Sequence, residues 1–279
     1  MKLALASIAL LTGCAQILGL EDTQLNFLDA PVDAPNVCDT PAFPCAATTG
    51  RALCGQLVTS GTATPFRVAN PTAQVCASTE GPCGLTVFGQ SLATYFAGGT
   101  LDRVTARVDD CGHFVVDMDP TATDVAIGIA GTDVVTSARL VLDLMAGAST
   151  EPGIAALVVP RTTSTGWATQ LAIAESEIAS GYLVRYVTTA GVAVPMEQVR
   201  VSGAPVGGPV ARPWAAYFTG EFETFDPSLM ATTALGTAFI APPTTGTFRI
   251  GGFHIGRTCE RAGLQSVTDT LLHVVLKGC

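Results

Sequence analysis

Glycine and proline interrupt this chain so often that its pattern suits short strands and tight turns rather than long helices. The 279 residues include 29 glycines and 17 prolines, and valine, threonine and alanine dominate the segments between them. β-Branched residues pack well in strands, whereas glycine and proline set the backbone angles that turns require. We therefore expect a mainly β protein.

The charge balance limits the partners that the chain can have. Charged residues make up 13% of it and its net charge is −9, whereas an average protein is about 25% charged. A nucleic-acid-binding surface needs clustered lysine and arginine side chains. We therefore expect no nucleic-acid partner.

The N-terminus has the parts of an export signal. Lys2 precedes an apolar core, Leu3–Leu11, which is shorter than the ~20 residues that a membrane-crossing helix needs. The segment Leu11-Thr12-Gly13-Cys14 resembles the lipobox of bacterial lipoproteins. This resemblance implies lipidation of Cys14, removal of residues 1–13, and a membrane partner through the attached lipid. The alternative is an ordinary secretory signal that happens to contain a cysteine.

The residue after Cys14 indicates to which membrane the lipoprotein would be sorted. Ala15 stands where lipoproteins kept in the inner membrane often carry Asp. The resemblance therefore implies an outer-membrane lipoprotein of the cell envelope, on the periplasmic side or at the cell surface. Asp-Ala-Pro then occurs twice, at 29–31 and 33–35. Because proline favours extended backbone, residues 14–37 are interpreted as the lipid anchor and a tether.

The cysteines indicate a disulfide framework. With Cys14 lipidated, eight of the nine cysteines remain, an even set in an exported chain, and export places them where disulfides persist. Proximity in the sequence suggests the pairs Cys76–Cys83 and Cys259–Cys279, and the remaining pairing stays open. The eight are Cys38, Cys45, Cys54, Cys76, Cys83, Cys111, Cys259 and Cys279.

An internal repeat is predicted from two similar segments. Residues 92–98 (LATYFAG) match residues 214–220 (WAAYFTG). Each segment is expected to be followed by a hairpin and then by an alternating strand, at 125–130 in the first copy and 247–255 in the second. We therefore expect the same structural unit twice.

One turn suggests what that unit is. Residues 108–114 (VDDCGHF) resemble the Thr-Asp-x-x-Gly-x-Phe turn of carboxypeptidase regulatory-like domains, which are transthyretin-like β-sandwiches. Val108 replaces the threonine, and the second copy keeps only Gly236 and Phe239. The resemblance implies two tandem transthyretin-like or Ig-like Greek-key β-sandwiches, at 38–133 and 180–279. Domains of this kind support or bind and rarely catalyse, an inference by analogy of fold.

The segment between the two units, 134–179, is expected to be a connector. Residues 137–145 and 154–159 have strand patterns. Residues 167–178 place apolar side chains at spacings of four, three and four, which predicts one short amphipathic helix.

The sequence contains no motif that identifies a catalytic residue, a metal site or a cofactor site. His113, His254 and His273 are each isolated in a strand-like segment, and motifs for zinc, serine and phosphate chemistry do not occur. A group of aspartates offers oxygen ligands of the kind that Ca²⁺ takes. They flank the strand 114–116 at opposite ends, so solvated turn carboxylates are the preferred interpretation. The group comprises Asp109, Asp110, Asp117, Asp119 and Asp124.

Three aromatic residues occur in one copy of the repeat only. Trp214, Tyr182 and Tyr186 have no counterpart in the first copy. Exposed aromatic rings stack on sugars or anchor protein partners. These three are therefore the candidate ligand-binding residues, although Trp214 could instead fill the end of a sandwich.

These observations together predict a lipid-anchored envelope protein with a structural, adhesive or binding role and no enzymatic activity. Its partner would be a protein or a glycan. Two alternatives stay open: a secreted hydrolase with dispersed catalytic residues, and an accessory subunit of an envelope complex that offers sheet edges for pairing.

Overall fold

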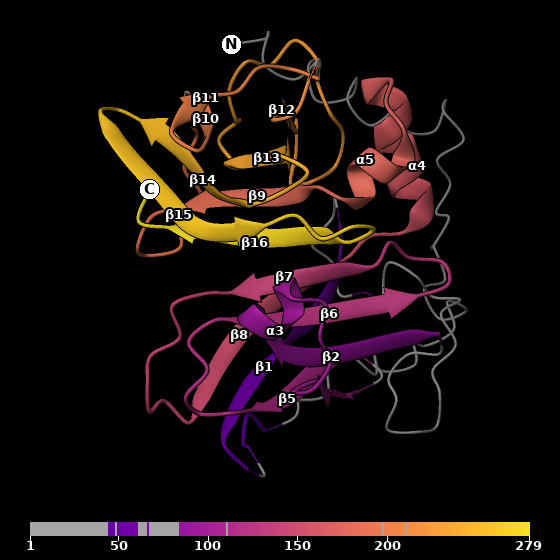
Figure 1. Ribbon diagram of the computed structural model, residues 1–279, viewed down its shortest axis with the longest axis vertical. Helices are drawn as coiled ribbons and strands as arrows, with labels where there is room; N and C mark the ends of the chain where they lie inside the picture. Colours follow the sequence, from indigo (N-terminus) through magenta and orange to yellow (C-terminus); the bar gives the residue numbers. More distant parts are fainter. Residues whose placement is uncertain are drawn as a thin grey trace, which may run out of the picture. The chain divides into compact units, whose positions relative to one another are not determined.

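The computed structural model describes residues 44–47, 49–60, 66, 84–109, 111–196, 198–209 and 211–279 (Figure 1). They belong to one compact unit, Ala42–Cys279. The predictions for Cys14, Cys38, Cys76, Cys83 and the tether lie outside the described residues. None of the helices in the described part is both long and apolar enough to span a bilayer.

An eight-stranded sheet, here called the central sheet, takes strands from both halves of the chain (Figure 1). The C-terminal strand β16 lies between β7 and β9 and pairs in parallel with both, whereas the other pairs of this sheet are antiparallel. The strands, in sheet order, are β12 (Trp214–Tyr217), β13 (Thr237–Ala241), β9 (Tyr182–Val187), β16 (Leu271–Lys277), β7 (Ser137–Val141), β6 (Val125–Gly131), β2 (Leu85–Ser91) and β3 (Val104–Thr105).

Two four-stranded sheets pack against the central sheet. The first outer sheet contains β4 (Arg107–Val108), β5 (His113–Met118), β1 (Arg51–Thr59) and β8 (Thr150–Val158), in that order, with β1 and β8 parallel. The second outer sheet contains β11 (Ala204–Pro205), β10 (Gln198–Val201), β14 (Thr247–His254) and β15 (Arg257–Gln265), all antiparallel.

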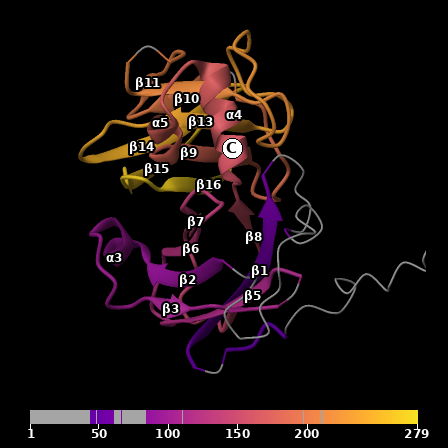
Figure 2. The same cartoon turned by 90° about the vertical axis from the view of Figure 1, so that its right-hand side faces the viewer.

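The outer sheets cover opposite faces of the central sheet (Figure 2). Successive side chains of a strand point to opposite faces, and β6 shows the consequence. Ile127 packs in one core with Leu57 and Phe114 of the first outer sheet, whereas its neighbour Ala126 belongs to the core that contains Ile250 of the second. The expected sandwiches are therefore layers that share one sheet, and the mainly β prediction is confirmed.

The strands expected in the connector are integral to the sheets. β7 lies in the middle of the central sheet and β8 forms an edge of the first outer sheet. The bounds expected for the two domains stay a prediction, but the residues between them complete both sheets rather than link two closed bodies.

The expected helix at 167–178 is two helices. α4 (Arg161–Leu171) begins after Pro160, and α5 (Glu175–Ala179) follows a break at Ala172. Ala172 has a left-handed conformation with φ of 53°, which ends α4 because the helix cannot continue through it. Trp167 and Ile178 pack in one core with Leu183 and Phe239 of the central sheet.

The two copies of the expected repeat do not share a structure, so that prediction is wrong. Leu92–Phe96 forms the helix α3, whose first turn is capped by the Ser91 hydroxyl. The matching segment Trp214–Tyr217 is the strand β12, paired with β13. The hairpin expected after the second segment is incomplete as well, because residues 231–233, which would form its first strand, are not a strand. The two segments have similar sequences but different secondary structures, because the first has a serine that caps a helix and the second has a partner strand.

Two disulfides lie among the described residues. The expected pair Cys259–Cys279 is present and ties β15 to Cys279, two residues beyond the end of β16. A second joins Cys45 to Cys54 of β1, which holds residues 45–47 against the outer side of the first outer sheet. Disulfides of this kind add about 2–4 kcal/mol to stability.

Arg51 is a buried side chain whose guanidinium is held by backbone carbonyl groups. Its side chain is 1% exposed and donates hydrogen bonds of 2.6–2.9 Å to the carbonyl oxygens of Pro120, Ala122, Met145 and Ala148. These carbonyl groups belong to two loops, 119–124 and 142–149. The guanidinium group of Arg51 therefore holds both loops against the start of β1.

Arg51→Met is expected to lower the free energy of unfolding by about 3 kcal/mol, because it leaves several part-buried carbonyl oxygens without a donor. Urea unfolding measures this, with Arg257→Met on exposed β15 as the control. A loss below about 1 kcal/mol, similar to the control, would show that these hydrogen bonds are dispensable.

Candidate ligand-binding site

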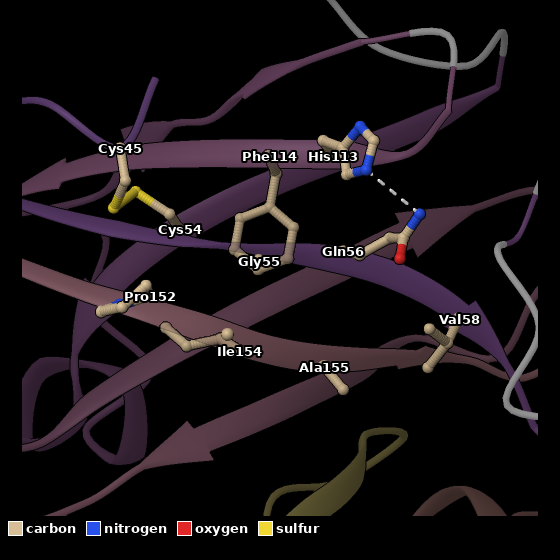
Figure 3. Close-up of a pocket in the computed structure, with 11 residues that line it drawn as sticks. Cys45, Cys54, Gly55, Gln56, Val58, His113, Phe114, Pro152, Ile154 and Ala155 are labelled. Carbon is tan, nitrogen blue, oxygen red and sulfur yellow. Dashed lines mark hydrogen bonds between the residues drawn. A yellow bond between two sulfur atoms is a disulfide. The ribbon is translucent and has the colours of Figure 1, made fainter. Parts of the chain in front are cut away.

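A groove opens on the outer side of the first outer sheet (Figure 3). Leu53 and Leu57 of β1 face the core, so the alternating residues Cys54 and Gln56 face this outer side. The groove has a volume of about 360 Å³, within the range of small-ligand sites. Its lining residues are Cys45, Cys54, Gly55, Gln56, Val58, His113, Phe114, Pro152, Gly153, Ile154 and Ala155.

A β-bulge creates the groove. Leu53 of β1 is opposite Glu151 of β8, but Gly55 is opposite Ile154, so β8 has one more residue than β1 in this interval. Gly153 accommodates the bulge with a φ of 76°. Bulges bend a strand and redirect its side chains, and the bulged residues Pro152, Gly153 and Ile154 all line the groove.

Gly55 keeps the floor of the groove open. A Cβ atom at position 55 would lie 2.7 Å from the ring of Phe114 and would also collide with the carbonyl oxygen of Ile154. Because glycine has no side chain, the core residues Phe114 and Ile154 reach the groove through the sheet (Figure 3). The floor and one wall are therefore apolar.

His113 and Gln56 supply the polar part of the groove lining, and Asp109 supports His113 from outside the groove. Asp109 Oδ2 lies 2.8 Å from His113 Nδ1, and His113 Nε2 lies 3.3 Å from Gln56 Nε2. The carboxylate accepts from Nδ1–H, so Nε2 is left as the acceptor for the Gln56 amide. This part of the lining offers a ligand polar groups with set directions, next to the apolar floor.

Cys111 lies beside the same pair. Its Sγ, a carboxylate oxygen of Asp109 and a ring nitrogen of His113 are all within 4.8 Å of one another. A cysteine, a histidine and an aspartate are what the hydrolase alternative would require. Cys111 is, however, 1% exposed, so its sulfur does not face a bound substrate.

Asp109 has a structural role in the turn between β4 and β5. Its Oδ1 accepts the backbone N–H groups of Cys111 and His113 at 2.9 Å each, while Oδ2 accepts from the His113 ring. Both oxygens therefore serve the turn, as expected of an aspartate that bonds its own backbone. The expected hairpin with its turn at 109–112 is confirmed.

The three aromatic candidates are core residues, so the prediction of an exposed binding surface is wrong. Tyr182 and Tyr186 are fully buried and donate hydrogen bonds to the carbonyl oxygens of Gln265 and Gly251 in the second outer sheet. Trp214 packs 5.2 Å from Phe239, measured between ring centroids. Burial raises the pKa of both tyrosines well above the usual value. They fasten layers together and reach no ligand.

Asp110 lies outside the described residues, and the described members of the acidic group do not converge on one point. Asp109 belongs to the turn before β5, and Asp119 follows that strand and accepts from Thr121 at 2.6 Å. Asp124 forms an ion pair of 2.8 Å with Arg261 of β15. The interpretation of these residues as turn carboxylates fits their positions better than a shared cation site.

The structure also brings together a basic group that the sequence analysis missed. Arg139 of β7 is opposite His273 of β16, and Arg185 lies on the neighbouring strand β9. His273 is 6% exposed, and neither of its ring nitrogens has a hydrogen-bond partner among the described residues. A signal existed: each of the three is a basic residue in the interior of a mainly apolar strand.

The electrostatics of this group follow from burial. Burial and the charges of Arg139 and Arg185 hold the pKa of His273 well below its usual value. Burial and the charge of Arg185 lower the pKa of Arg139 to about 10. His273 is therefore neutral at physiological pH, while Arg139 stays charged.

No protein-family model matches the chain, and no curated protein matches it in sequence. Among solved structures, a streptococcal ancillary pilin is 12% identical over 82% of this chain and 69% of its own, with a TM-score of 0.23. The Bacillus anthracis TIE protein is 10% identical over 82% of this chain and 34% of its own, with a TM-score of 0.22. Shaft pilin SpaA from Lactobacillus rhamnosus GG is 8% identical over 83% of this chain and 98% of its own, with a TM-score of 0.23. Similarity at this level does not transfer a function, so the proposal below rests on the residues of this chain.

The stability of the fold is expected to fall as the pH is lowered from 7 toward 5. His273 takes up a proton near pH 6.5 when unfolded but stays neutral when folded, so below that pH the unfolded state binds the extra proton. One such group changes the free energy of unfolding by at most about 1.4 kcal/mol per pH unit. Urea unfolding at several pH values measures the slope, and His273→Met should flatten it. Parallel pH profiles for the two proteins would contradict this assignment.

Proposed function

We propose that this chain is a lipid-anchored protein of the cell envelope that binds a ligand and carries out no reaction of its own. The observation that supports it best is the groove on the first outer sheet, which combines an apolar floor with the polar side chains of Gln56 and His113, the latter supported by Asp109. Such a site suits a small amphipathic group, either free or presented by a protein or glycan partner.

The surroundings of the groove favour binding over reaction. Its walls lie on strands and on the Cys45–Cys54 disulfide, so the site is held in place before a ligand arrives, and preorganisation of this kind favours affinity. A hydrolase would need an accessible nucleophile beside His113, whereas Cys111 is buried.

Filling the groove is expected to weaken binding. Ala155 is an exposed residue of β8 that lines the groove, and Ala155→Arg would place a long charged side chain against the apolar floor. The probe is the neutral apolar dye N-phenyl-1-naphthylamine, whose fluorescence rises in an apolar site. We expect saturable dye binding that Ala155→Arg weakens at least about tenfold, equivalent to 1.4 kcal/mol.

The matched control is Ala190→Arg, an exposed alanine in the turn after β9 that lines no part of the groove. It should bind the dye as the unmodified protein does. Equal binding by all three proteins would overturn the groove as the ligand site.

Lipid anchoring through Cys14 is tested separately. Cells grown with labelled palmitate should label the full chain, and Cys14→Ala should lose the label and leave the membrane fraction, because the acyl chains supply the membrane affinity. Cys38→Ala should keep the label. Labelling that persists in Cys14→Ala would reject the anchor.

A further inference from the structure

A second cavity, here called the cleft, lies on the other side of the β8 bulge. It has a volume of about 350 Å³. β7 and β8 lie close together where the Ser137 hydroxyl donates to the carbonyl oxygen of Leu157, and both strands line the cleft further along. β15 and β16 contribute the remaining wall. The cleft is therefore enclosed by all three sheets.

Arg139 is one of the residues that line the cleft. Its Nε and Nη1 atoms are buried without a hydrogen-bond partner among the described residues, and no ion pair of Arg139 occurs there either. The neighbouring Arg185, by contrast, is paired with Glu221 at 2.5 Å. Buried N–H donors without an acceptor are unfavourable. Arg139, which is half-buried overall, therefore offers donors that an anion in the cleft would satisfy.

The other charges around the cleft are already matched, with two exceptions. Arg261 pairs with Asp124 and Asp143, and Glu260 lies 3.6 Å from Arg249. Lys277 and Glu151 line the cleft and have no ion pair among the described residues. Because Arg261 faces two aspartates, the charges in and around the cleft sum to zero, and Arg139 is the arginine of the lining without an ion pair among the described residues.

We propose that the cleft binds a small molecule through a single carboxylate, held by Arg139. A guanidinium group presents parallel N–H donors that match the two oxygens of a carboxylate. The carboxylates of Glu151, Asp143 and Glu260 at the rim repel a dianion such as phosphate more strongly than a monoanion. Leu142, Ile154 and Val275 offer an apolar wall for the rest of the molecule.

The probe is benzoate, with benzamide as its neutral counterpart of the same shape and inorganic phosphate as the dianion. Calorimetry and thermal unfolding of the folded protein, in a buffer free of carboxylates, measure binding. We expect benzoate to bind saturably and to raise Tm with concentration, as a ligand specific for the folded state does. Benzamide should not bind, and phosphate should bind more weakly than benzoate. Equal binding of benzoate and benzamide, or tighter binding of phosphate, would overturn the proposal.

The variant Arg139→Met tests whether Arg139 serves ligand binding or the stability of the fold. Without ligand, this variant should be at least as stable as the unmodified protein, because it replaces a half-buried charged group by an apolar chain of similar length. It should weaken benzoate binding at least about 30-fold, the loss typical of a hydrogen-bonded charge. Arg257→Met, on exposed β15 and outside the cleft, should change neither quantity. A marked loss of stability in Arg139→Met alone would overturn the proposal.

Glu151→Gln excludes an internal partner for Arg139. Under the proposal this variant removes a repulsive charge from the rim, so benzoate should bind several-fold more tightly with Tm unchanged. If Glu151 paired with Arg139 in solution instead, the variant would lower Tm and the unmodified protein would not bind benzoate. That result would overturn the proposal even if Arg139→Met failed to fold.

Discussion

The parallel pairing of β16 with β7 and β9 holds the structure together. β16 is the last strand of the chain, yet it lies in the middle of the central sheet, between strands from the first half and strands from the second. Its residues Leu272, Val274 and Leu276 enter the core shared with the second outer sheet. Without β16, the ladder of backbone hydrogen bonds would divide between β7 and β9. The Cys259–Cys279 disulfide secures this strand at the point where the chain could otherwise fray.

A shared sheet has consequences for where polar residues can lie. Both of its faces are covered, by the two outer sheets and by α4 and α5, so its central strands read as nearly continuous apolar runs. Arg139, Arg185 and His273 depart from this rule at neighbouring positions on one face. Apolar packing alone would have placed aliphatic side chains there. Polar residues retained at such a position point to a function that packing does not explain.

The bulge of β8 connects the two cavities. Pro152, Gly153 and Ile154 line both the groove and the cleft, so one irregularity in an edge strand shapes a hollow on each side. Rigid strands rather than long loops therefore position both sites. This arrangement suits binding by a preformed surface. The disulfide at Cys54 and the hydrogen bonds of Arg51 both hold β1 beside the bulge, so they support the binding sites as well as the stability of the fold.

The sequence by itself determined the class of the fold, the strands β5, β6, β8 and β14, the turn at Asp109–Gly112 and the Cys259–Cys279 pair. These depend on local alternation, turn chemistry and proximity in the chain. Only the tertiary structure decided that 92–96 is a helix and 214–217 a strand, that Tyr182, Tyr186 and Trp214 are buried, and that Arg139 meets His273. The physical reason is the same in each case. Strand partners and burial come from residues far apart in the chain: His273 and Arg139 are neighbours only because β16 returns to pair with β7, and no local pattern records that contact.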